Sequence, residues 1–259
     1  MDRRLYKQLR EIERNHWWFR GRRAIFLAAL DRLAVRGSTI LDCGCGAGSN
    51  LDVLRARYPD AAIYGIDIER EPLEFLREER SLPVNQADAA RLPFLPASFD
   101  LVAALDAIEH VEDDERALAE LYRVCKPGGT LLLSVPAFPF LWGNIDEVGH
   151  HYRRYRRAPL VAQVERVGFE IRFVRFFNYL LFAPIAAVRL AMRLRPTRHD
   201  RDDDESAEEL RSDFDLVKSG PLNSLLARLF SLEAGLLGLA PPFGVSLLLV
   251  ARRPAEQDL

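Results

Sequence analysis

The chain has 259 residues, of which 49% are hydrophobic and 29% charged, and its formal net charge is −2. This is enough for one large α/β domain with an elaboration, and the composition excludes wholesale disorder. A nearly neutral chain is not a generally basic nucleic-acid binder, so nucleic acid is not an expected partner. Three cysteines form an odd, sparse set, which disfavours a disulfide framework and favours a reducing compartment.

The N-terminal segment 1–15 is charged throughout and has no apolar region followed by a small-residue cleavage site, so no signal peptide is predicted. The most membrane-like run, 176–188, has thirteen residues between two arginines, whereas a spanning helix needs about 20. These features predict a cytoplasmic protein. Association with a membrane surface remains an alternative.

Short apolar runs alternate with amphipathic stretches between residues 35 and 136, the pattern of βαβ units in a parallel sheet. This pattern predicts strands at 38–42, 62–66, 83–86, 101–105 and 130–135, with helices at 49–58, 71–79 and 113–124. After an aromatic and arginine-rich loop, a helix is predicted at 159–167 and two more strands at 169–174 and 244–251. Apolar helices at 176–194 and 222–239 flank an acidic stretch between these last two strands.

The predicted fold is therefore α/β, with a doubly wound, seven-stranded, mostly parallel sheet. Four parts are expected: an N-terminal helical lid at 1–34, a core at 35–175, a helical insert at 176–242 with an acidic linker at about 196–215, and a final strand with its tail at 243–259.

A glycine-rich turn follows the first predicted strand and leads into a helix; it reads DCGCGAGSN over residues 42–50. Glycines let the backbone turn tightly and approach a bound molecule, and free amides at a helix N-terminus favour an anionic group. Asp67 comes nineteen residues after Gly48, at the end of the next strand, where its carboxylate can accept hydrogen bonds from both hydroxyls of a ribose. Together these features predict a cofactor that contains adenosine.

The spacing of the glycines distinguishes between such cofactors. A dinucleotide-binding loop reads G-x-G-x-x-G, but counted from Gly44 the sixth position is Ser49, and the third glycine falls one place early at Gly48. Asp42 would repel a pyrophosphate and attract a cationic group. These features disfavour NAD and favour S-adenosylmethionine, which has a sulfonium and an ammonium group. The stretch resembles the first motif of the class I S-adenosylmethionine-dependent methyltransferases, an acid followed by G-x-G-x-G.

Four further stretches resemble this family in the same order. Asp67 resembles its ribose-binding acid, Asp88-Ala89 its adenine-binding pair, 99–102 its fourth strand and 126–129 its turn into strand five. The resemblance covers about residues 40–136 and implies S-adenosylmethionine as the cofactor and S-adenosylhomocysteine as its product. With the residues that flank these motifs, the implied cofactor-binding set is Asp42, Gly44, Cys45, Gly46, Gly48, Asn50, Asp67, Ile68, Asp88, Ala89, Asp106, Trp18 and Arg22.

Methyl transfer from a sulfonium is an in-line displacement, so the protein must align the reactants and remove a proton from a hydroxyl nucleophile. Residues 106–111, at the end of the fourth strand, resemble the acid-x-x-Glu-His segment of ubiquinone-type O-methyltransferases. The resemblance implies His110 as the catalytic base, with Glu109 beside it. In the alternative interpretation, His110 only braces the loop or packs beside the cofactor. No metal site is predicted.

A run of arginine, histidine and tyrosine, GHHYRRYRR at 149–157, follows the fifth strand at the edge of the sheet where ligands bind. Such a run can clamp a phosphate, diphosphate or carboxylate of the acceptor through bidentate contacts. The alternatives are a solvated loop that leads into the next helix and, less favoured, a small nucleic-acid contact. The candidate substrate-binding residues are Trp142, His150, His151, Tyr152, Arg153, Arg154 and Tyr155.

The sequence NHWWFRGRR at 15–23 resembles the start of a methyltransferase subgroup associated with glycan, lipid or natural-product modification. A helix here can cover the cofactor and bring Arg22 near its carboxylate. The alternative is that Trp17 and Trp18 simply pack onto the sheet.

The long insert before the last strand departs from the family pattern, in which a tight hairpin joins the last two strands. Its apolar helices can form a hydrophobic acceptor tunnel, a homodimer interface or a face that rests on a membrane. These alternatives remain open at this point.

The features together predict a methyltransferase that acts, at oxygen, on a small lipid-like or sugar-like acceptor, with a phosphorylated acceptor among the options. Two alternatives are a non-catalytic S-adenosylmethionine-binding interaction module and a peripheral-membrane quinone or lipid methyltransferase.

Overall fold

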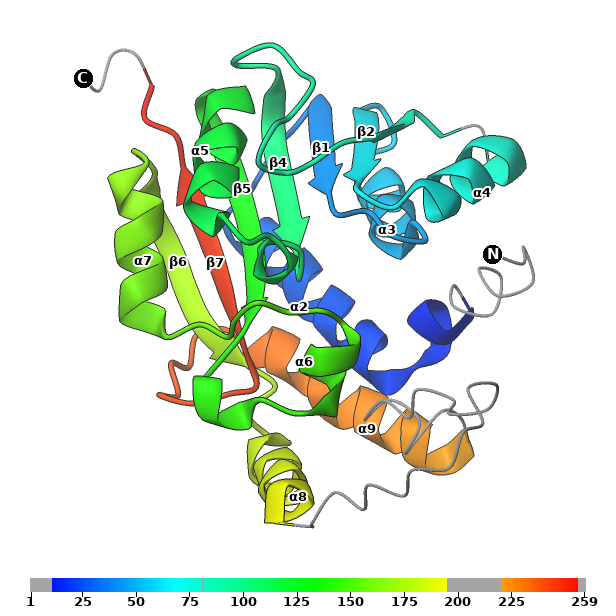
Figure 1. The fold of residues 1–259 in the computed structure, drawn as a ribbon, viewed down its shortest axis with the longest axis vertical. Helices are drawn as coiled ribbons and strands as arrows, with labels where there is room; N and C mark the ends of the chain where they lie inside the picture. The colour runs from blue at the N-terminus through cyan, green and yellow to red at the C-terminus, as the bar shows by residue number, and fades with distance from the viewer. Residues whose placement is uncertain (1–10, 81, 195–219, 256–259) are drawn as a thin grey trace, which may run out of the picture.

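A seven-stranded sheet with helices on both faces forms the body of the molecule (Figure 1). The computed structural model describes residues 11–80, 82–194 and 220–255. The strands are β1 (Thr39–Cys43), β2 (Ala62–Asp67), β3 (Val84–Gln86), β4 (Phe99–Leu105), β5 (Cys125–Pro136), β6 (Glu170–Phe177) and β7 (Ser246–Arg252). The helices are α2 (Trp17–Arg32), α3 (Ser49–Arg57), α4 (Arg70–Arg80), α5 (Asp114–Val124), α6 (Asn144–Val148), α7 (Arg157–Arg166), α8 (Phe182–Leu194) and α9 (Gly220–Leu232).

The strand order is β3-β2-β1-β4-β5-β7-β6. Strand β7 runs antiparallel to both β5 and β6, and the other neighbouring strands pair in parallel. The predicted doubly wound, mostly parallel sheet is thereby confirmed. The chain leaves β1 toward β2 and later returns to place β4 on the other side of β1. In an open α/β sheet this switch of direction leaves a crevice at the carboxyl ends of the two strands.

Alternate residues along the strands enter two separate cores, as the two-residue period of a strand requires. In β4, Leu101 and Ala103 pack on the side of α2, α3 and α4, whereas Val102 and Ala104 pack on the side of α5 and α7. All four are fully buried. Because both faces of the sheet are covered, its strands are nearly continuous apolar runs. These runs are the feature from which the strands were predicted.

Element boundaries differ from the prediction by more than two residues at three places. Strand β5 begins at Cys125, because Phe99 pairs with Cys125 before the register shifts. Strand β6 extends to Phe177, so 176 and 177 belong to the sheet and the first insert helix begins only at Phe182. An uninterrupted apolar run does not show its own period, which explains this error. The second insert helix ends at Leu232, and a 3-10 turn continues to Leu236. The predicted acidic linker lies outside the described residues.

The insert packs back onto the N-terminal helix, and Figure 1 shows α9 alongside α2. The fully buried ring of Phe230 lies 5.6 Å from the Trp18 ring, between centroids. A Cβ atom on Gly21 would lie 2.2 Å from Phe230 Cδ1, so only glycine permits this close approach. The backbone N–H of Trp17 donates to Asn223 Oδ1 at 2.8 Å. The predicted N-terminal lid and insert therefore contact each other directly.

In the part of the chain that the structure describes, every helix is too short or too polar to cross a bilayer. Helices α8 and α9 nevertheless expose apolar side chains. The predicted membrane or homodimer contact of the insert remains a prediction. The exposed apolar residues of the two helices are Val188, Leu190, Met192, Leu222, Leu225 and Leu232.

Candidate functional site

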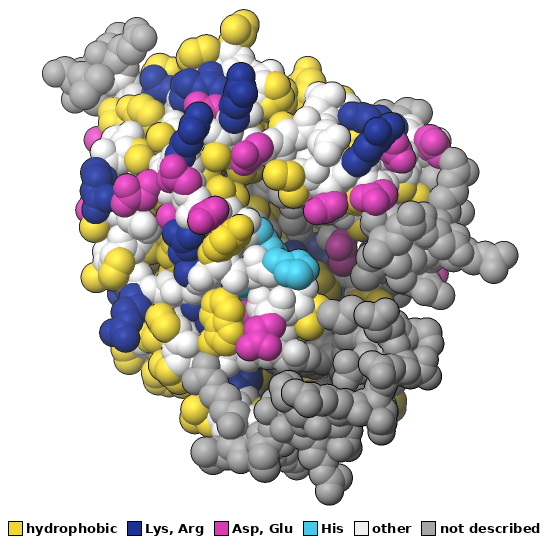
Figure 2. Space-filling model, in the orientation of Figure 1, with side chains coloured by type: hydrophobic (Ala, Val, Ile, Leu, Met, Phe, Trp, Pro, Cys, Tyr) yellow, Lys and Arg dark blue, Asp and Glu magenta, His cyan; other side chains and the backbone are white. Residues whose placement is uncertain are grey.

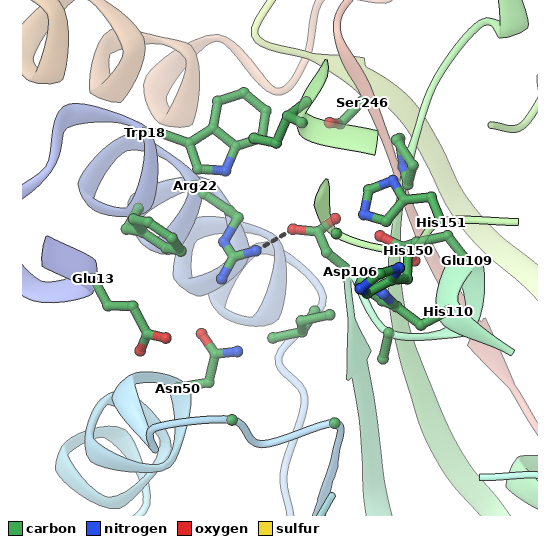
Figure 3. A pocket seen from close by; sticks show the side chains of 18 of the residues that line it. Glu13, Trp18, Arg22, Asn50, Asp106, Glu109, His110, His150, His151 and Ser246 are labelled. Carbon is green, nitrogen blue, oxygen red and sulfur yellow. Dashed lines mark hydrogen bonds and ion pairs between the residues drawn. The ribbon is translucent and has the colours of Figure 1, made fainter. Parts of the chain in front are cut away.

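A cavity of about 1350 Å³ opens at the carboxyl ends of β1, β2 and β4. Its walls come from the glycine loop after β1, from α2, from the segments that follow β4 and β5, and from the insert helices. Figure 3 shows Glu13 and Asn50 on one side of this space, Glu109 with three histidines on the other, and Arg22 and Asp106 between them. Ligand pockets usually have volumes of roughly 300 to 1000 Å³, so this cavity has room for more than one small molecule.

The glycine loop forms the floor of one end. Gly44 and Gly46 line the cavity and have φ angles of +80° and +48°, in the left-handed region that favours glycine. A Cβ atom on Gly44 would lie 2.7 Å from the Cβ of Ala107. Gly48 does not line the cavity, because it faces Leu76, whose Cδ2 atom would lie 2.7 Å from an added Cβ. The loop ends where α3 begins, so helix amides point toward a ligand.

Asp67 links this loop to the next strand. Its Oδ2 atom accepts from the Gly46 N–H at 2.8 Å, and Oδ1 accepts from the Glu69 N–H at 3.0 Å. Each carboxylate oxygen keeps a lone pair for a hydroxyl donor. Ile68, Asp88 and Ala89 also line this end of the cavity, so these predicted cofactor residues lie together.

Arg22 of α2 forms an ion pair with Asp106 at the end of β4 (Figure 3). Asp106 has a φ of +54° and accepts from the Ser134 hydroxyl at 2.9 Å. The Arg22 side chain is buried, and its Nε–H has no hydrogen-bond partner among the described residues. Asn50 Oδ1 likewise lacks a partner within the described chain. Because buried polar atoms are normally paired, these two atoms fit the polar groups of a ligand.

Asp42 corrects one expectation. Its side chain is fully buried and does not line the cavity, so it lies behind the glycine loop rather than facing a ligand. Neither carboxylate oxygen has a hydrogen-bond partner in the described part of the chain. Burial raises the pKa of Asp42 to about 8, with Arg22 opposing and Asp67 reinforcing the shift. The predicted direct attraction between Asp42 and a cationic ligand is therefore not supported.

The residues at this end fit S-adenosylmethionine. The glycine floor leaves room for a nucleoside, Asp67 offers acceptors to ribose hydroxyls, and Arg22 offers a buried donor for a carboxylate. Cys45 and Trp18 complete the predicted residues that line this part.

The opposite wall is polar and begins with a 3-10 turn at Ile108–His110. Glu109 is fully buried and lines the cavity, and neither of its carboxylate oxygens has a hydrogen-bond partner among the residues described. Burial, with Asp106 nearby, raises the pKa of Glu109. The His110 and His151 rings meet edge to face with centroids 4.5 Å apart. Partial removal from water, and then the nearness of His151, lower the pKa of His110.

His151 is held by a buried acid that the sequence analysis missed. Asp146 is fully buried; its Oδ1 atom lies 2.8 Å from His151 Nδ1 and accepts from Arg154 Nε at 2.8 Å. Its Oδ2 atom accepts from the Gly143 N–H at 2.8 Å. Burial alone would raise the pKa of Asp146, but the hydrogen bonds from His151 and Arg154 outweigh it and lower that pKa.

The predicted arginine clamp on the acceptor remains a prediction, and the two arginines at its centre already have partners within the chain. Arg154 is buried and donates to Asp146 and to the Ala137 carbonyl. Arg153 donates to Asp114 and to the Glu112 carbonyl. These guanidinium groups hold the loop onto the core, and their hydrogen bonds to it leave fewer donors for an anionic acceptor. Of the predicted substrate-binding residues, His150, His151, Tyr152 and Arg154 line the cavity, whereas Trp142, Arg153 and Tyr155 do not.

The insert supplies an apolar wall. Leu181, Pro184, Ile185 and Val188 lie in or just before α8, and Leu226 lies in α9. An acceptor tunnel was among the predictions for the insert, but none of these residues was predicted, because nothing local shows which side of an apolar helix faces a cavity. Other lining residues that were not predicted include Glu13, Trp17, Phe19, Ser49, Glu69 and Ser246.

Comparison with known proteins agrees with this geometry. Residues 41–133 match the family model described as a methyltransferase domain. The chain is 39% identical to the demethylmenaquinone methyltransferase of Thermus thermophilus, over 66% of this chain and 88% of that protein. The chain belongs to the S-adenosylmethionine-dependent methyltransferases. This methyltransferase is also 32% identical to the ubiquinone biosynthesis O-methyltransferase of Pseudomonas paraeruginosa, over 58% of this chain and 72% of the relative.

A solved structure supports the fold of this methyltransferase. A chain from the complex of the Haloferax volcanii Trm112 methyltransferase activator with a methyltransferase superposes with a TM-score of 0.61, at 21% identity, over 97% of this chain and 95% of the other. The methyltransferase spans 38% to 62% of the length of four other curated relatives. The acceptors of these relatives therefore do not establish the acceptor of this chain.

Proposed function

We propose that this methyltransferase transfers a methyl group to a hydroxyl of a small, lipid-like acceptor. One observation carries the proposal: a single cavity joins the glycine loop and Asp67 to a polar wall at His110 and an apolar wall at α8. A cofactor seated on the loop would present its reactive end to a space bounded by both walls.

The size of the cavity supports a second ligand. Its volume of about 1350 Å³ exceeds the usual range for a single ligand, roughly 300 to 1000 Å³. The glycine end lies against β1 and β2, and the space beyond Asp106 continues to the insert. The acceptor would occupy this second part.

The apolar wall supports a lipid-like acceptor. Ile185 and Val188 of α8 and Leu226 of α9 present aliphatic side chains to the cavity. Each methylene group that they remove from water contributes about 0.8 kcal/mol to binding. Two relatives at 39% and 32% identity are named for demethylmenaquinone and for ubiquinone biosynthesis. Both names refer to quinones, which favours an acceptor that combines a ring with an apolar chain over a sugar, and the second name specifies transfer to oxygen.

The polar wall supports transfer to oxygen. When bound, S-adenosylmethionine would supply a methyl group on a sulfonium; the oxygen of a deprotonated hydroxyl would bond to the methyl carbon as S-adenosylhomocysteine leaves. The polar wall, where Glu109, His110 and His151 meet, would promote the loss of the hydroxyl proton. Arg22 and Asp67 would hold the cofactor while Asp106 fixes Arg22. In-line alignment of this kind contributes much of the acceleration in group transfer.

The test uses radiolabelled S-adenosylmethionine and the full chain with acceptors of three classes: hydroxylated aromatic lipids, sugars and phosphorylated small molecules. We expect label to enter a lipid-extractable product, and mass spectrometry of that product to place the methyl group on oxygen. Label in a sugar or phosphorylated product would contradict the acceptor class. Cofactor binding without a labelled product from any class or from a metabolite extract would favour the non-catalytic binding module.

A further inference from the structure

We propose that Glu109, His110 and His151 form a binding site for a divalent transition-metal ion, of which Zn²⁺ fits best, at the acceptor end of the cavity. The sequence analysis predicted no metal site. His110 and His151 are forty-one positions apart, and only the fold brings the segment after β5 against the turn after β4.

The donor atoms are already gathered. One ligand atom from each of the three side chains lies within 4.8 Å of the other two. Ligands at about 2.0 to 2.2 Å from a tetrahedral zinc ion lie roughly 3.4 Å from one another. Closing the set therefore requires side-chain movements of about an ångström. His110 is exposed, and Figure 2 shows histidine side chains, in cyan, at the surface near the middle of this face. A backbone hydrogen bond, from the Tyr152 N–H to the Glu109 carbonyl at 2.8 Å, fixes the two segments to each other.

The burial of Glu109 supports the site independently of the distances between the donor atoms. Its side chain has no exposed surface, lines the cavity, and leaves both carboxylate oxygens without a hydrogen-bond partner in the described chain. An unpaired buried carboxylate is costly, and proteins normally offset that cost with a hydrogen bond, an ion pair or a metal ion. Arg22 and Arg154, the nearby guanidinium groups, are already bound to Asp106 and Asp146. A cation between Glu109 and the two imidazoles would satisfy the carboxylate.

His151 is oriented as metal-bound histidines are. Its Nδ1 atom lies 2.8 Å from Asp146 Oδ1, which leaves Nε2 for a ligand. A carboxylate on the far ring nitrogen typically fixes the tautomer and orientation of a metal-ligating histidine. Asp146 is held in turn by Arg154 and by the Gly143 N–H. A Cβ atom on Gly149 would lie 3.0 Å from His151 Nε2, so glycine at this position leaves the ligand atom accessible.

The donor set indicates the kind of metal. Two imidazoles and one carboxylate suit Zn²⁺ and related transition metals, whereas Mg²⁺ prefers oxygen ligands. Three protein ligands leave a fourth position open, as in catalytic rather than structural zinc sites. That position would face the acceptor part of the cavity.

The role of the ion rests on the proposed function. An acceptor hydroxyl at the open position would lose its proton to solvent water at a lower pH than the free hydroxyl, because the cation stabilises the alkoxide or phenolate. The oxygen would then form a bond to the methyl carbon while the bond from that carbon to sulfur breaks, releasing S-adenosylhomocysteine. In this arrangement His110 acts as a ligand rather than as the base.

The experiment measures metal binding directly, on tag-free full-length protein stripped with a chelator and dialysed. Calorimetric titration with Zn²⁺ should show one saturable site, and Co²⁺ should give the visible absorption of a low-coordinate site with nitrogen ligands. Mg²⁺ should not displace Co²⁺. Glu109→Gln and His151→Gln should each weaken Zn²⁺ binding at least tenfold, and Asp146→Asn by 10- to 100-fold, the usual effect of losing a supporting carboxylate.

His150→Gln is the matched control, because His150 is the neighbouring cavity-lining histidine outside the cluster. It should leave Zn²⁺ affinity unchanged. Absence of saturable Zn²⁺ binding to the wild type, or equal affinity in wild type, E109Q and H151Q, would overturn the proposal. Circular dichroism of each variant separates loss of metal from loss of fold.

The two proposals fail separately. Zn²⁺ binding without a methylated product from any acceptor would leave the metal site standing and remove the proposed function. Full methyl transfer by chelator-stripped protein would leave the function standing and overturn the catalytic role of the ion. S-adenosylmethionine affinity, measured in the same preparations, shows whether the cofactor end is intact.

Discussion

Arg22, in the N-terminal helix, is paired with Asp106 at the end of β4, eighty-four residues away, and both side chains are largely buried. This pair links α2, which covers the cofactor end of the cavity, to β4. The acceptor end of the cavity begins where β4 ends. Arg22 also lies over the Phe19 ring at 5.1 Å from the centroid, which fixes the plane of its guanidinium.

Replacing Arg22 should weaken cofactor binding. Arg22→Met keeps much of the apolar volume but loses the charged hydrogen bonds, each of which contributes about 1.5 to 3 kcal/mol, so the Kd for S-adenosylmethionine should rise roughly 10- to 100-fold. Calorimetry gives this value. Arg20→Met, an exposed position on the same helix, is the control and should bind as the wild type does. Equal affinities for all three proteins would contradict the placement of Arg22.

Asp67 offers a second test of the cofactor end. Asp67→Ala removes acceptors for the ribose and also the hydrogen bond that holds Gly46, so affinity for S-adenosylmethionine should fall by at least about 1.5 to 3 kcal/mol. NAD should not bind either protein measurably. Asp60→Ala, at an exposed site after α3, serves as the control. An unchanged Kd in the Asp67 variant would contradict the ribose assignment.

The buried carboxyl of Asp42 predicts a pH-dependent stability. Its pKa is raised to about 8 in the folded protein, so the folded state retains a proton that the unfolded chain loses near pH 4. Stability from this group is therefore present at low pH and is lost as the pH rises from about 4 to about 8. Asp42→Asn, which stays neutral, should gain stability over the wild type across that interval, at up to about 1.4 kcal/mol per pH unit.

Urea denaturation of the wild type and the Asp42 variant at pH 5, 7 and 9 measures this difference. Asp60→Asn is the control for removing an exposed carboxylate. Parallel curves of stability against pH for wild type and D42N would show that Asp42 is ionised in the folded protein.

Helix α8 should select the acceptor. Val188 lines the cavity and Leu190, two residues later, does not, although both are 44% exposed. Val188→Ser should raise KM for an apolar acceptor several-fold, since about 1 to 2 kcal/mol of apolar contact is lost. Leu190→Ser should leave KM near the wild-type value. Equal effects of the two changes would place the acceptor elsewhere, and the KM for S-adenosylmethionine should not change in either variant.

Phe230 should stabilise the contact between insert and N-terminal helix. It is fully buried, and Phe230→Ala should lower the free energy of unfolding by about 3 to 5 kcal/mol. Gly21→Ala alone should also destabilise, because its methyl group would overlap the Phe230 ring. In the double variant the cost of the methyl group should largely disappear, and a double-mutant cycle from urea denaturation tests this coupling. Leu232→Ala, exposed on the same helix, should change stability by less than about 0.5 kcal/mol.

The sequence predicted the sheet and the cofactor end well, because their signals are local. Apolar runs marked the strands, and the spacing from Gly44 to Asp67 placed two adjacent strand ends at one edge. Gly48 and Asp42 belong to the same motif but do not line the cavity, since a motif does not show which members face the ligand and which face the core.

The acceptor end could not be predicted in the same way. Glu109 and His110 were singled out, but the link from His151 to Asp146 depends on how a long segment folds back after β5. The arginines at 153 and 154 looked like an anion site because their partners, Asp114 and Asp146, lie in other elements. Charge in a sequence does not show whether it is neutralised within the fold.

Strands β6 and β7 pair so that Phe177 lies opposite Ser246. The chain thus leaves the sheet at Phe177 and rejoins it at the neighbouring Ser246, so the number of residues between them imposes nothing on the register of the strands. A different insert between these residues would therefore change the apolar wall of the cavity, and with it the choice of acceptor, while the pairing of β6 with β7 and the cofactor end stay the same.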